Sequence, residues 1–354
     1  MATLDKHWSE RDTTPSRIDD ALRALLVDIH HEDAQVVPAR VLNLVCIVDA
    51  GFSGEIANRL RGVGRFHASR TIVCSIEEGR TQVDAVATVS APDMVDEQGI
   101  QLMRETVVVN CGPQHLPRLD RLVDPLVVSD LPVCVWSPHG HDDGLAALLP
   151  LADVVLYDSA DATDTRTGLR TAMRLSQQAY LVDLAWLRTT PWRERIAATF
   201  DPVPLRGQLQ LFSGLQVRVH PESTGAAMLL IGWLASRLHW RTGPLLQQDG
   251  RLMGSAAAHR QEVRLEIAGD PTMPVRGLSG LTLETAAGRV LSLNRGPGGL
   301  RAHYTSPEGA DREWTIMGAS RGEPGILGEG LRQAMLRDRT FFPALDAAST
   351  LLPG

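Results

Sequence analysis

The chain has 354 residues, of which 44% are hydrophobic and 22% are charged, and its formal net charge is -7. This length allows two domains, and the composition is typical of a soluble globular protein. The net negative charge argues against a nucleic-acid partner, because binding to phosphates needs clustered cations. The longest apolar run, 226–235, is far shorter than the ~20 residues that cross a bilayer, so we expect no membrane partner.

The N-terminal sequence MATLDKHWSERD is polar and lacks the apolar core of a signal peptide. The four cysteines have no CxxC spacing, and each lies in or beside an apolar run: Cys46, Cys74, Cys111 and Cys134. This pattern is typical of buried thiols in a reducing compartment. We therefore expect a cytoplasmic protein.

The first clear element along the chain is an amphipathic helix over 16–31, where apolar residues recur at helical spacing along one face. Ser16 and Asp19 suit its first turn, and Pro15 prevents the helix from extending upstream. The residues before the helix are expected to form an extended or mobile arm.

A regular alternation of strands and helices follows. Strands are predicted at 41–48, 71–76, 84–90, 106–110, 132–136 and 153–157. Helices are predicted at 55–61, 116–128, 144–149 and 165–178. Such alternation indicates a largely parallel sheet that is covered by helices on both faces. The short link 77–83 predicts an antiparallel insertion at the two strands that it joins.

The second half of the chain has a different pattern. Helices are predicted at 181–200 with an interruption at Pro191, and at 224–239, 325–336 and 341–352. Strands are predicted at 215–220, 263–267, 281–285, 289–293, 300–304 and 313–317. Glycine-containing turns separate the last of these strands, which is typical of an antiparallel meander.

The predicted fold class is α/β with two domains. The N-terminal domain, 1–178, has a mostly parallel (mixed) sheet flanked by helices. The C-terminal domain, 179–354, is α+β and contains the antiparallel meander.

The turn DAGFSG at 49–54 joins the first buried strand to a predicted helix, a position at which α/β proteins bind phosphate. It matches neither the GxGxxG fingerprint nor a P-loop. A tight strand-to-helix turn is the simplest interpretation, and nucleotide binding is the alternative.

Two other polar clusters allow both a chemical and a structural interpretation. HGHDD at 139–143 contains residue types that bind metals, but a solvated loop has the same composition. Asp158, Asp161 and Asp164 follow a predicted strand, where carboxylate catalysis and an ordinary loop with a helix cap both remain open. There is no GxSxG motif. The sequence therefore predicts no catalytic residue, no metal site and no cofactor.

Tryptophan is unusually frequent, with seven residues against three tyrosines and six phenylalanines. Trp186 and Trp192 lie beside Arg188 and Arg193, and this combination is frequent at the centre of protein interfaces. Rings that fill a core, with arginines outside, are the alternative. That core interpretation is preferred for Trp233 and Trp240.

Six segments resemble, in the same order, sequence blocks of one known family. They are ARVLNLVCIVD, FHASRTIVCSI, VDPLVVSDLPVCVWSP, LADVVLYDSAD, VDLAWLRTTPWRERIAATFD and LLIGWLASRLHW. Ala68 replaces a proline in the second block, and Ser137 replaces a tryptophan in the third. With the N-terminal LDKHWSERDTTPSRIDDALRALL, the resemblance runs from about residue 4 to 240. The family is that of the glucose-6-phosphate dehydrogenase assembly proteins, OpcA.

The resemblance implies a non-catalytic protein that binds glucose-6-phosphate dehydrogenase and promotes its assembly or activity. The alternatives are an α/β enzyme that binds a nucleotide or sugar phosphate, and a purely structural scaffold. The expected partner-interface residues are His67, Arg70, Asp130, Trp136, Asp183, Trp186, Arg188, Trp192 and Arg193. Of these, Asp130 also suits a turn, and Asp183 also suits the N-cap of the helix that carries Trp186.

Overall fold

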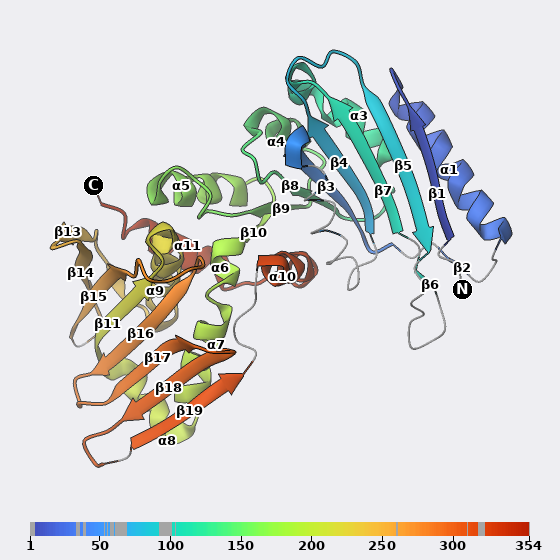
Figure 1. Cartoon of the computed structure of the whole chain (residues 1–354). Helices are drawn as coiled ribbons and strands as arrows, with labels where there is room; N and C mark the ends of the chain where they lie inside the picture. The colour runs from blue at the N-terminus through green and yellow to red at the C-terminus, as the bar shows by residue number, and fades with distance from the viewer. Residues whose placement is uncertain are drawn as a thin grey trace. The chain divides into compact units, whose positions relative to one another are not determined.

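The computed structural model describes residues 4–32, 36–37, 40–52, 54, 56, 60, 69–91, 101–102, 104–259, 261–309, 311–317 and 323–353. The chain divides into two compact units (Figure 1). The first comprises 1–157, 178–182 and 330–335, and the second comprises 158–177, 183–329 and 336–354. The domain boundary at 178 stays a prediction.

The first unit is built on an eight-stranded mixed sheet in the order β1-β5-β7-β4-β3-β8-β9-β10. The pairs β7–β4, β4–β3, β3–β8 and β8–β9 are parallel, whereas β1–β5 and β5–β7 are antiparallel. The strands are β1 (Leu4–Glu10), β3 (Leu42–Asp49), β4 (Ser69–Ile76), β5 (Asp84–Ala91), β7 (Arg104–Cys111), β8 (Val133–Trp136), β9 (Val154–Tyr157) and β10 (Tyr180–Asp183). A separate parallel ladder joins β2 (Val36–Val37) to β6 (Gln101–Leu102).

The predicted, mostly parallel sheet is confirmed, and its strand order reverses direction at β3. After β3 the chain adds β4 and then β7 on one side, and later adds β8, β9 and β10 on the other. All but the last residue of β3 are buried, as expected for a central strand covered on both faces. The carboxyl ends of β3 and β8 therefore meet at a topological switch point, where open α/β sheets bind their ligands.

The predicted antiparallel strand in the sheet is confirmed as β5, but β5 does not pair with β4, the strand that precedes it in the chain. β5 is antiparallel to β7, and β7 lies between β5 and β4. The N-terminal arm is an ordered edge strand, because β1 pairs with β5 along its whole length. Pairing of this kind joins residues about 80 positions apart, as in Lys6 with Val89, and leaves no periodic signal in the sequence.

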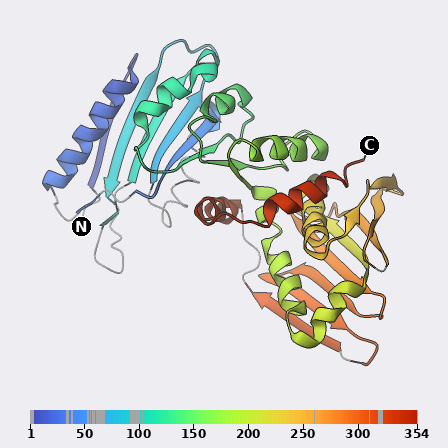
Figure 2. The same cartoon turned by 180° about the vertical axis from the view of Figure 1, so that it is seen from behind.

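The helices of the first unit begin with α1 (Pro15–Glu32), which contacts β1 and β5 and confirms the predicted amphipathic helix (Figure 2). Its buried stripe is Ile18, Leu22, Leu25 and Ile29. The predicted helix 116–128 is divided into short turns, because Pro117 and Pro125 lack the N–H of a regular helix. The remaining elements are η1 (Ala50–Phe52), η2 (Pro113–Arg118), α3 (Asp120–Val123), η3 (Asp124–Leu126) and α4 (Asp142–Leu148).

The second unit contains a nine-stranded sheet. Its strands lie side by side in the order β12-β14-β15-β11-β16-β17-β18-β19, and β13 pairs with β14. The meander β16 to β19 is confirmed, but β11 lies between β15 and β16 and is parallel to β15. The strands are β11 (Phe212–Val219), β12 (Arg241–Thr242), β13 (Leu246–Gln248), β14 (Arg251–Ala257), β15 (Glu262–Gly269), β16 (Leu278–Thr285), β17 (Val290–Gly296), β18 (Gly299–Thr305) and β19 (Asp311–Met317).

Helix α9 (Thr224–Leu238) contacts β11 and β15 of this sheet and packs against α11 (Phe341–Ser349). The predicted helix 181–200 is wrong at its start, where β10 ends, and continues as α6 (Leu184–Leu187) and α7 (Thr190–Phe200). The remaining helices are α5 (Thr165–Ser176), α8 (Val203–Arg206), η4 (Gly207–Leu211), η5 (Pro221–Ser223) and α10 (Glu323–Leu336). In the described part of the chain, no helix has the length and apolar character to span a bilayer.

Gly232 allows the close approach of α9 and α11. A Cβ at this position would overlap the carbonyl oxygen of Ala344 and lie 2.8 Å from the amide nitrogen of Ala348. We expect Gly232→Ala to lower the free energy of unfolding by about 1–3 kcal/mol through this overpacking, despite the better helix propensity of alanine. Chemical denaturation measures the change. Gly243→Ala is the control, because no atom in the described part of the chain lies within 4 Å of a Cβ there. Equal stability of the two variants would contradict the expectation.

Candidate functional site

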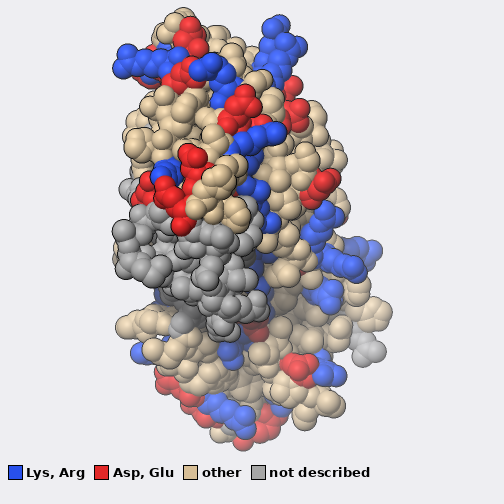
Figure 3. Space-filling model, turned by 90° about the vertical axis from the view of Figure 1, so that its right-hand side faces the viewer, with Lys and Arg blue, Asp and Glu red and all other residues tan. Residues whose placement is uncertain are grey.

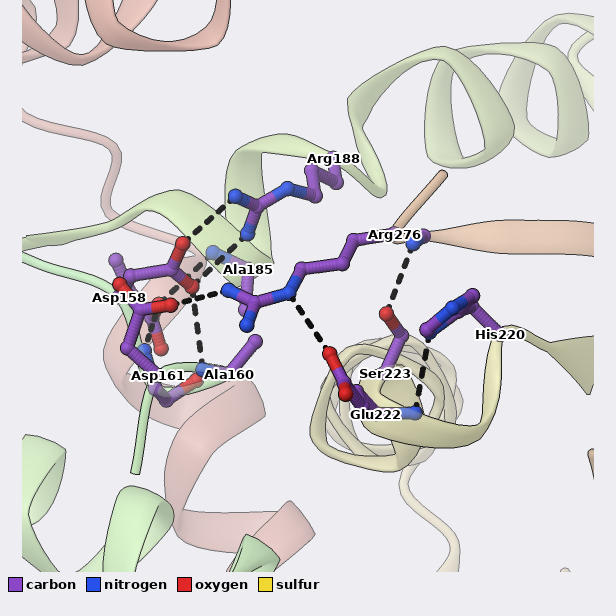
Figure 4. Close-up of polar contacts among 12 residues, drawn as sticks. Asp158, Ala160, Asp161, Ala185, Arg188, His220, Glu222, Ser223 and Arg276 are labelled. Carbon is purple, nitrogen blue, oxygen red and sulfur yellow. Dashed lines mark hydrogen bonds and ion pairs between the residues drawn. The ribbon is translucent and has the colours of Figure 1, made fainter. Parts of the chain in front are cut away.

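Five residues of the second unit form the acid–arginine cluster: Asp158, Asp161, Asp183, Arg188 and Arg276. Figure 4 labels all of them except Asp183. The first two follow β9, and the third ends β10, so the carboxylates gather where two neighbouring strands end. The arginines come from the end of α6 and from the residues before β16.

The centre of the cluster is a buried, bidentate ion pair. Both guanidinium nitrogens of Arg188 donate to Asp158, from Nη1 to Oδ1 at 2.9 Å and from Nη2 to Oδ2 at 2.6 Å. The side chains are only 5% and 6% exposed. Such forked contacts fix the orientation of both groups and compensate their loss of hydration. The carboxylate of Asp158 also accepts the amide N–H of Ala160 at 3.1 Å.

Arg276 extends the cluster toward the first turn of α9. It pairs with Asp161 and with Glu222, whose carboxylate lies 3.2 Å from Nε. The next residue, Gly277, donates its N–H to the Ser223 hydroxyl at 2.8 Å. Burial and the charge of Asp158 raise the pKa of Asp161, against the opposing effect of the Arg276 guanidinium. The ion pairs thus join three distant segments of the unit into one network.

Asp183 is fully buried and serves as the N-cap of α6, which was one of the two predicted roles. Its Oδ1 accepts two backbone N–H groups, from Ser159 at 3.0 Å and from Ala185 at 2.9 Å. Burial, followed by the charge of Asp158, raises the pKa of Asp183 to about 7, although the hydrogen bonds from Ser159 and Ala185 favour the charged form. This carboxyl therefore titrates near neutral pH.

A second group in the same unit surrounds Trp186. The indole Nε1 donates to Asp338 Oδ2 at 3.0 Å, and the Arg193 guanidinium lies 3.5 Å from the ring centroid. The ring of Phe341 packs beside it with a centroid separation of 5.6 Å. Arg193 is also 3.6 Å from Asp338, and burial lowers its pKa to about 10, so it stays charged at neutral pH. The arginine therefore stacks on the ring inside the unit.

Most of the predicted interface residues are not at the surface, so the simple view of an exposed docking face needs correction. The buried ones are Arg70, Trp136, Asp183, Trp186, Arg188 and Trp192. Arg193 is only 11% exposed, and Asp130 is exposed with a φ of 68°, which confirms its turn position. His67 lies outside the described residues. Trp186 and Trp192 are 2% and 1% exposed, so neither ring is available for direct contact in this conformation.

In the first unit, Arg70 has a structural role. Its Nε donates to Glu105 at 2.8 Å across the β4–β7 pair, and its Nη1 donates to the carbonyl of Leu126 at 2.9 Å. Both charged side chains are buried, with Arg40 as a second partner of the carboxylate. A charge pair with this geometry holds two interior strands of the sheet to the segment that follows α3.

Sequence reasoning missed Arg276, Glu222 and Asp338, which complete the two groups. Arg276 reaches Asp161 across 115 residues, and no local pattern indicates such a contact. The interpretation of Asp164 as a helix cap is confirmed, because its Oδ1 accepts the Thr167 N–H at 2.8 Å at the start of α5.

The other two polar motifs of the sequence meet in the first unit. The amide N–H of Asp49 donates to His139 Nδ1 at 2.9 Å, and its Oδ1 lies 2.9 Å from His141 Nε2. Within the residues that the structure describes, no three His, Cys, Asp or Glu side chains are grouped to hold a metal ion.

All four thiols are buried, and the charges on the face in Figure 3 are of both signs. Burial raises the pKa of all four cysteines, that of Cys111 to about 11, so the thiols are neutral at physiological pH. On the face shown in Figure 3, acidic and basic side chains are interspersed. Near α1 several are paired, among them Arg17 with Glu10 and Arg23 with Asp19, each at 2.7 Å.

Comparison with known proteins gives two consecutive family matches. Residues 61–174 match the glucose-6-phosphate dehydrogenase subunit N-terminal domain, and residues 179–345 match the C-terminal domain of the same subunit. Relatives described as "Putative OxPP cycle protein OpcA" occur in Synechocystis sp. and Synechococcus elongatus. They are 25% and 26% identical over 207 residues, which cover 56% of this chain and 44% and 46% of theirs. The chain thus spans less than half the length of these relatives.

Among solved structures, the WlbA dehydrogenase of Thermus thermophilus, in complex with NAD and UDP-GlcNAcA, has a TM-score of 0.43 and 12% identity over 88% of this chain and 95% of its own. A likeness of this size assigns neither fold nor activity. The two family matches, by contrast, are consecutive and cover most of the sequence. The chain belongs to the OpcA family of glucose-6-phosphate dehydrogenase subunits.

Proposed function

We propose that this chain is a non-catalytic subunit that binds glucose-6-phosphate dehydrogenase and promotes its assembly or raises its activity, in support of the oxidative pentose phosphate pathway. The observation that carries the proposal is the ordered match to both subunit domains, over 61–174 and 179–345. The four buried cysteines, none of them in a disulfide, support a cytoplasmic location.

The geometry of the charged groups favours a binding role over turnover. In the acid–arginine cluster, Asp158 is fully engaged by Arg188, and Asp161 is paired with Arg276. General acids, bases and nucleophiles need reactive atoms that a substrate can reach. The ion pairs instead connect the loop after β9 to the start of α9, which is how a rigid scaffold is built.

A subunit without its own chemistry can activate an enzyme only by binding one of its states more tightly than another. A tenfold shift between two states of the dehydrogenase requires a difference of ~1.4 kcal/mol in binding free energy. One well-placed interface residue can supply that amount.

The predicted interface residues divide into two kinds in this proposal. Asp130 is exposed in a turn and is available for direct contact. The buried residues Trp186, Trp192, Arg188 and Asp183 act through the surface segments that they hold in place.

The test is an assay of the dehydrogenase from the same organism with increasing amounts of this chain. We expect its rate to rise to a plateau, with co-elution of the two proteins in size-exclusion chromatography. Asp130→Asn is expected to shift the titration to higher concentration. Asp249→Asn is the matched control, because Asp249 is also exposed and has a φ of 48°. An unchanged rate together with separate elution would exclude the proposal, as would turnover of a sugar phosphate by this chain alone.

A further inference from the structure

The geometry points to a sugar-binding site at the carboxyl edge of the first sheet, formed by Asp49, His141 and Phe52. The proposed ligand is a small sugar, free or phosphorylated, that presents adjacent hydroxyl groups. The inference goes beyond the proposed function and does not depend on it, since the site lies within the first unit.

Asp49 and His141 lie where two paired parallel strands end. Asp49 is the last residue of β3, and His141 directly precedes α4, after the strand β8 that pairs with β3. The chain adds strands on opposite sides of this pair, so the loops after β3 and β8 diverge from each other at this edge. Open α/β sheets bind their ligands at this position because the diverging loops leave it accessible.

Two histidines contact Asp49, one at its backbone and one at its carboxylate. Its amide donates to His139 Nδ1 at 2.9 Å, which requires the proton of that imidazole to reside on Nε2. Its Oδ1 lies 2.9 Å from His141 Nε2, yet the side chain remains 49% exposed. His139 thus holds the backbone of Asp49, and His141 lies beside its carboxylate. A carboxylate at a fixed position that still reaches solvent can accept hydrogen bonds from two adjacent hydroxyls, as acidic residues do toward ribose.

An aromatic ring packs against His139, the histidine that accepts the Asp49 amide. Phe52 is 48% exposed, and its ring centroid lies 5.0 Å from that of His139. An exposed ring at a fixed position offers an apolar face on which the C–H face of a sugar can pack. A Cβ built on the flanking Gly51 meets no atom of the described residues within 4 Å. Carboxylate, imidazole and ring together match the mixed polar and apolar surface of a carbohydrate.

The chemistry of the group favours a sugar over a metal ion. A stable metal site needs at least three converging ligands, and the described residues contain no such group. Among the residues described here, one carboxylate and one aromatic ring fit a ligand that has both hydroxyl and C–H surfaces.

Isothermal titration of the full chain with glucose 6-phosphate, ribose 5-phosphate, glucose and inorganic phosphate tests the inference. We expect saturable binding of at least one sugar and at least a tenfold loss of affinity in Asp49→Asn, which keeps the size and the backbone contact. Asp311→Asn is the matched control, because it removes an exposed aspartate–histidine contact, with His303, on the second sheet. This variant is expected to bind like the parent chain.

Three results would overturn the site: no saturable binding of any sugar at millimolar concentration, equal binding of inorganic phosphate and the sugar phosphates, or parent-like affinity in Asp49→Asn. Glucose against glucose 6-phosphate shows whether the phosphate contributes. If Asp49→Asn does not fold, Phe52→Ala at its exposed position replaces it, with the same tenfold loss expected. The dehydrogenase is absent from this titration. A negative result would therefore exclude the sugar site without bearing on the proposed binding to the dehydrogenase.

Discussion

Truncation of Trp186 to alanine is expected to lower the free energy of unfolding of the second unit by about 3–5 kcal/mol. The ring is 2% exposed, so its removal leaves a cavity in a packed interior. The change also removes the donor to Asp338 and the ring on which the Arg193 guanidinium stacks. Urea denaturation followed by far-UV circular dichroism measures the effect as a shift of the unfolding midpoint.

Two further variants separate the contributions. Trp233→Ala is the matched control, since Trp233 lies on α9 and is only half-buried, and a smaller loss of stability is expected. Trp186→Phe keeps the six-membered ring but loses the Nε1–H, so its cost combines a smaller cavity with the hydrogen bond to Asp338, worth about 1.5–3 kcal/mol as a bond to a charged group. If Trp186→Ala unfolds at the same urea concentration as the parent chain, the ring does not support the fold and a direct interface role regains support.

The sequence alone predicts Trp186 as an interface residue, whereas the structure buries it inside the second unit. Tryptophan beside arginine occurs at interfaces and also inside a unit, and the sequence does not distinguish the two. In the structure Arg193 lies on the ring of Trp186, and both contact Asp338, which is about 150 positions away in the chain. Loss of partner binding in a tryptophan variant is therefore informative only when its stability is measured in the same experiment.

The elements that sequence could predict are those with a strong local pattern. The stripe of α1 has the helical period, and β3 is an unbroken apolar run, so both were predictable. β14 was missed, because its sequence RLMGSAA has small residues and no clear alternation. β10 has only four residues, too few to show a period of two, and it was assigned to the following helix.

Strand order and site assembly depend on contacts that local patterns do not contain. β11 is inserted between β15 and β16, which are consecutive in the chain, and nothing in the intervening turn indicates this. The same holds for Asp49 and His139, which are 90 residues apart and were interpreted as separate motifs. The cap role of Asp183 was accessible, because an aspartate before a helix start is a local signal. Its burial was not.

That burial leads to the second large effect, a pH-dependent stability that Asp183→Asn should remove. The carboxyl has a pKa of about 7 in the folded chain against an ordinary value of 3.8, mainly because it is buried and secondly because Asp158 is charged. Between these values the folded state holds a proton that the unfolded state releases. Stability contributed by this group is therefore present at low pH and is lost as the pH rises toward 7.

The size of the effect follows from the width of that window. A difference of about three pH units, at 1.36 kcal/mol each, amounts to about 4 kcal/mol by neutral pH. Asparagine cannot ionise, and both backbone N–H groups donate to Oδ1, so its carbonyl can keep the two hydrogen bonds. We expect the stability of Asp183→Asn relative to the parent chain to rise by about 4 kcal/mol between pH 4 and pH 8.

Chemical denaturation of Asp183→Asn and of the parent chain across this pH range gives the free energy of unfolding of each. Their difference is free of the titration of all other groups, because the two chains share them. Asp164→Asn provides the contrast, because hydrogen bonds from the Thr167 amide and hydroxyl lower the pKa of this exposed cap. Its stability relative to the parent should fall as the pH rises through the acidic range, a change of opposite sign. A difference for Asp183→Asn that stays constant from pH 4 to pH 8 would mean that this carboxylate is already ionised in the folded chain. Asp183 would then carry its full negative charge at neutral pH, whereas a pKa of about 7 leaves it about half ionised there.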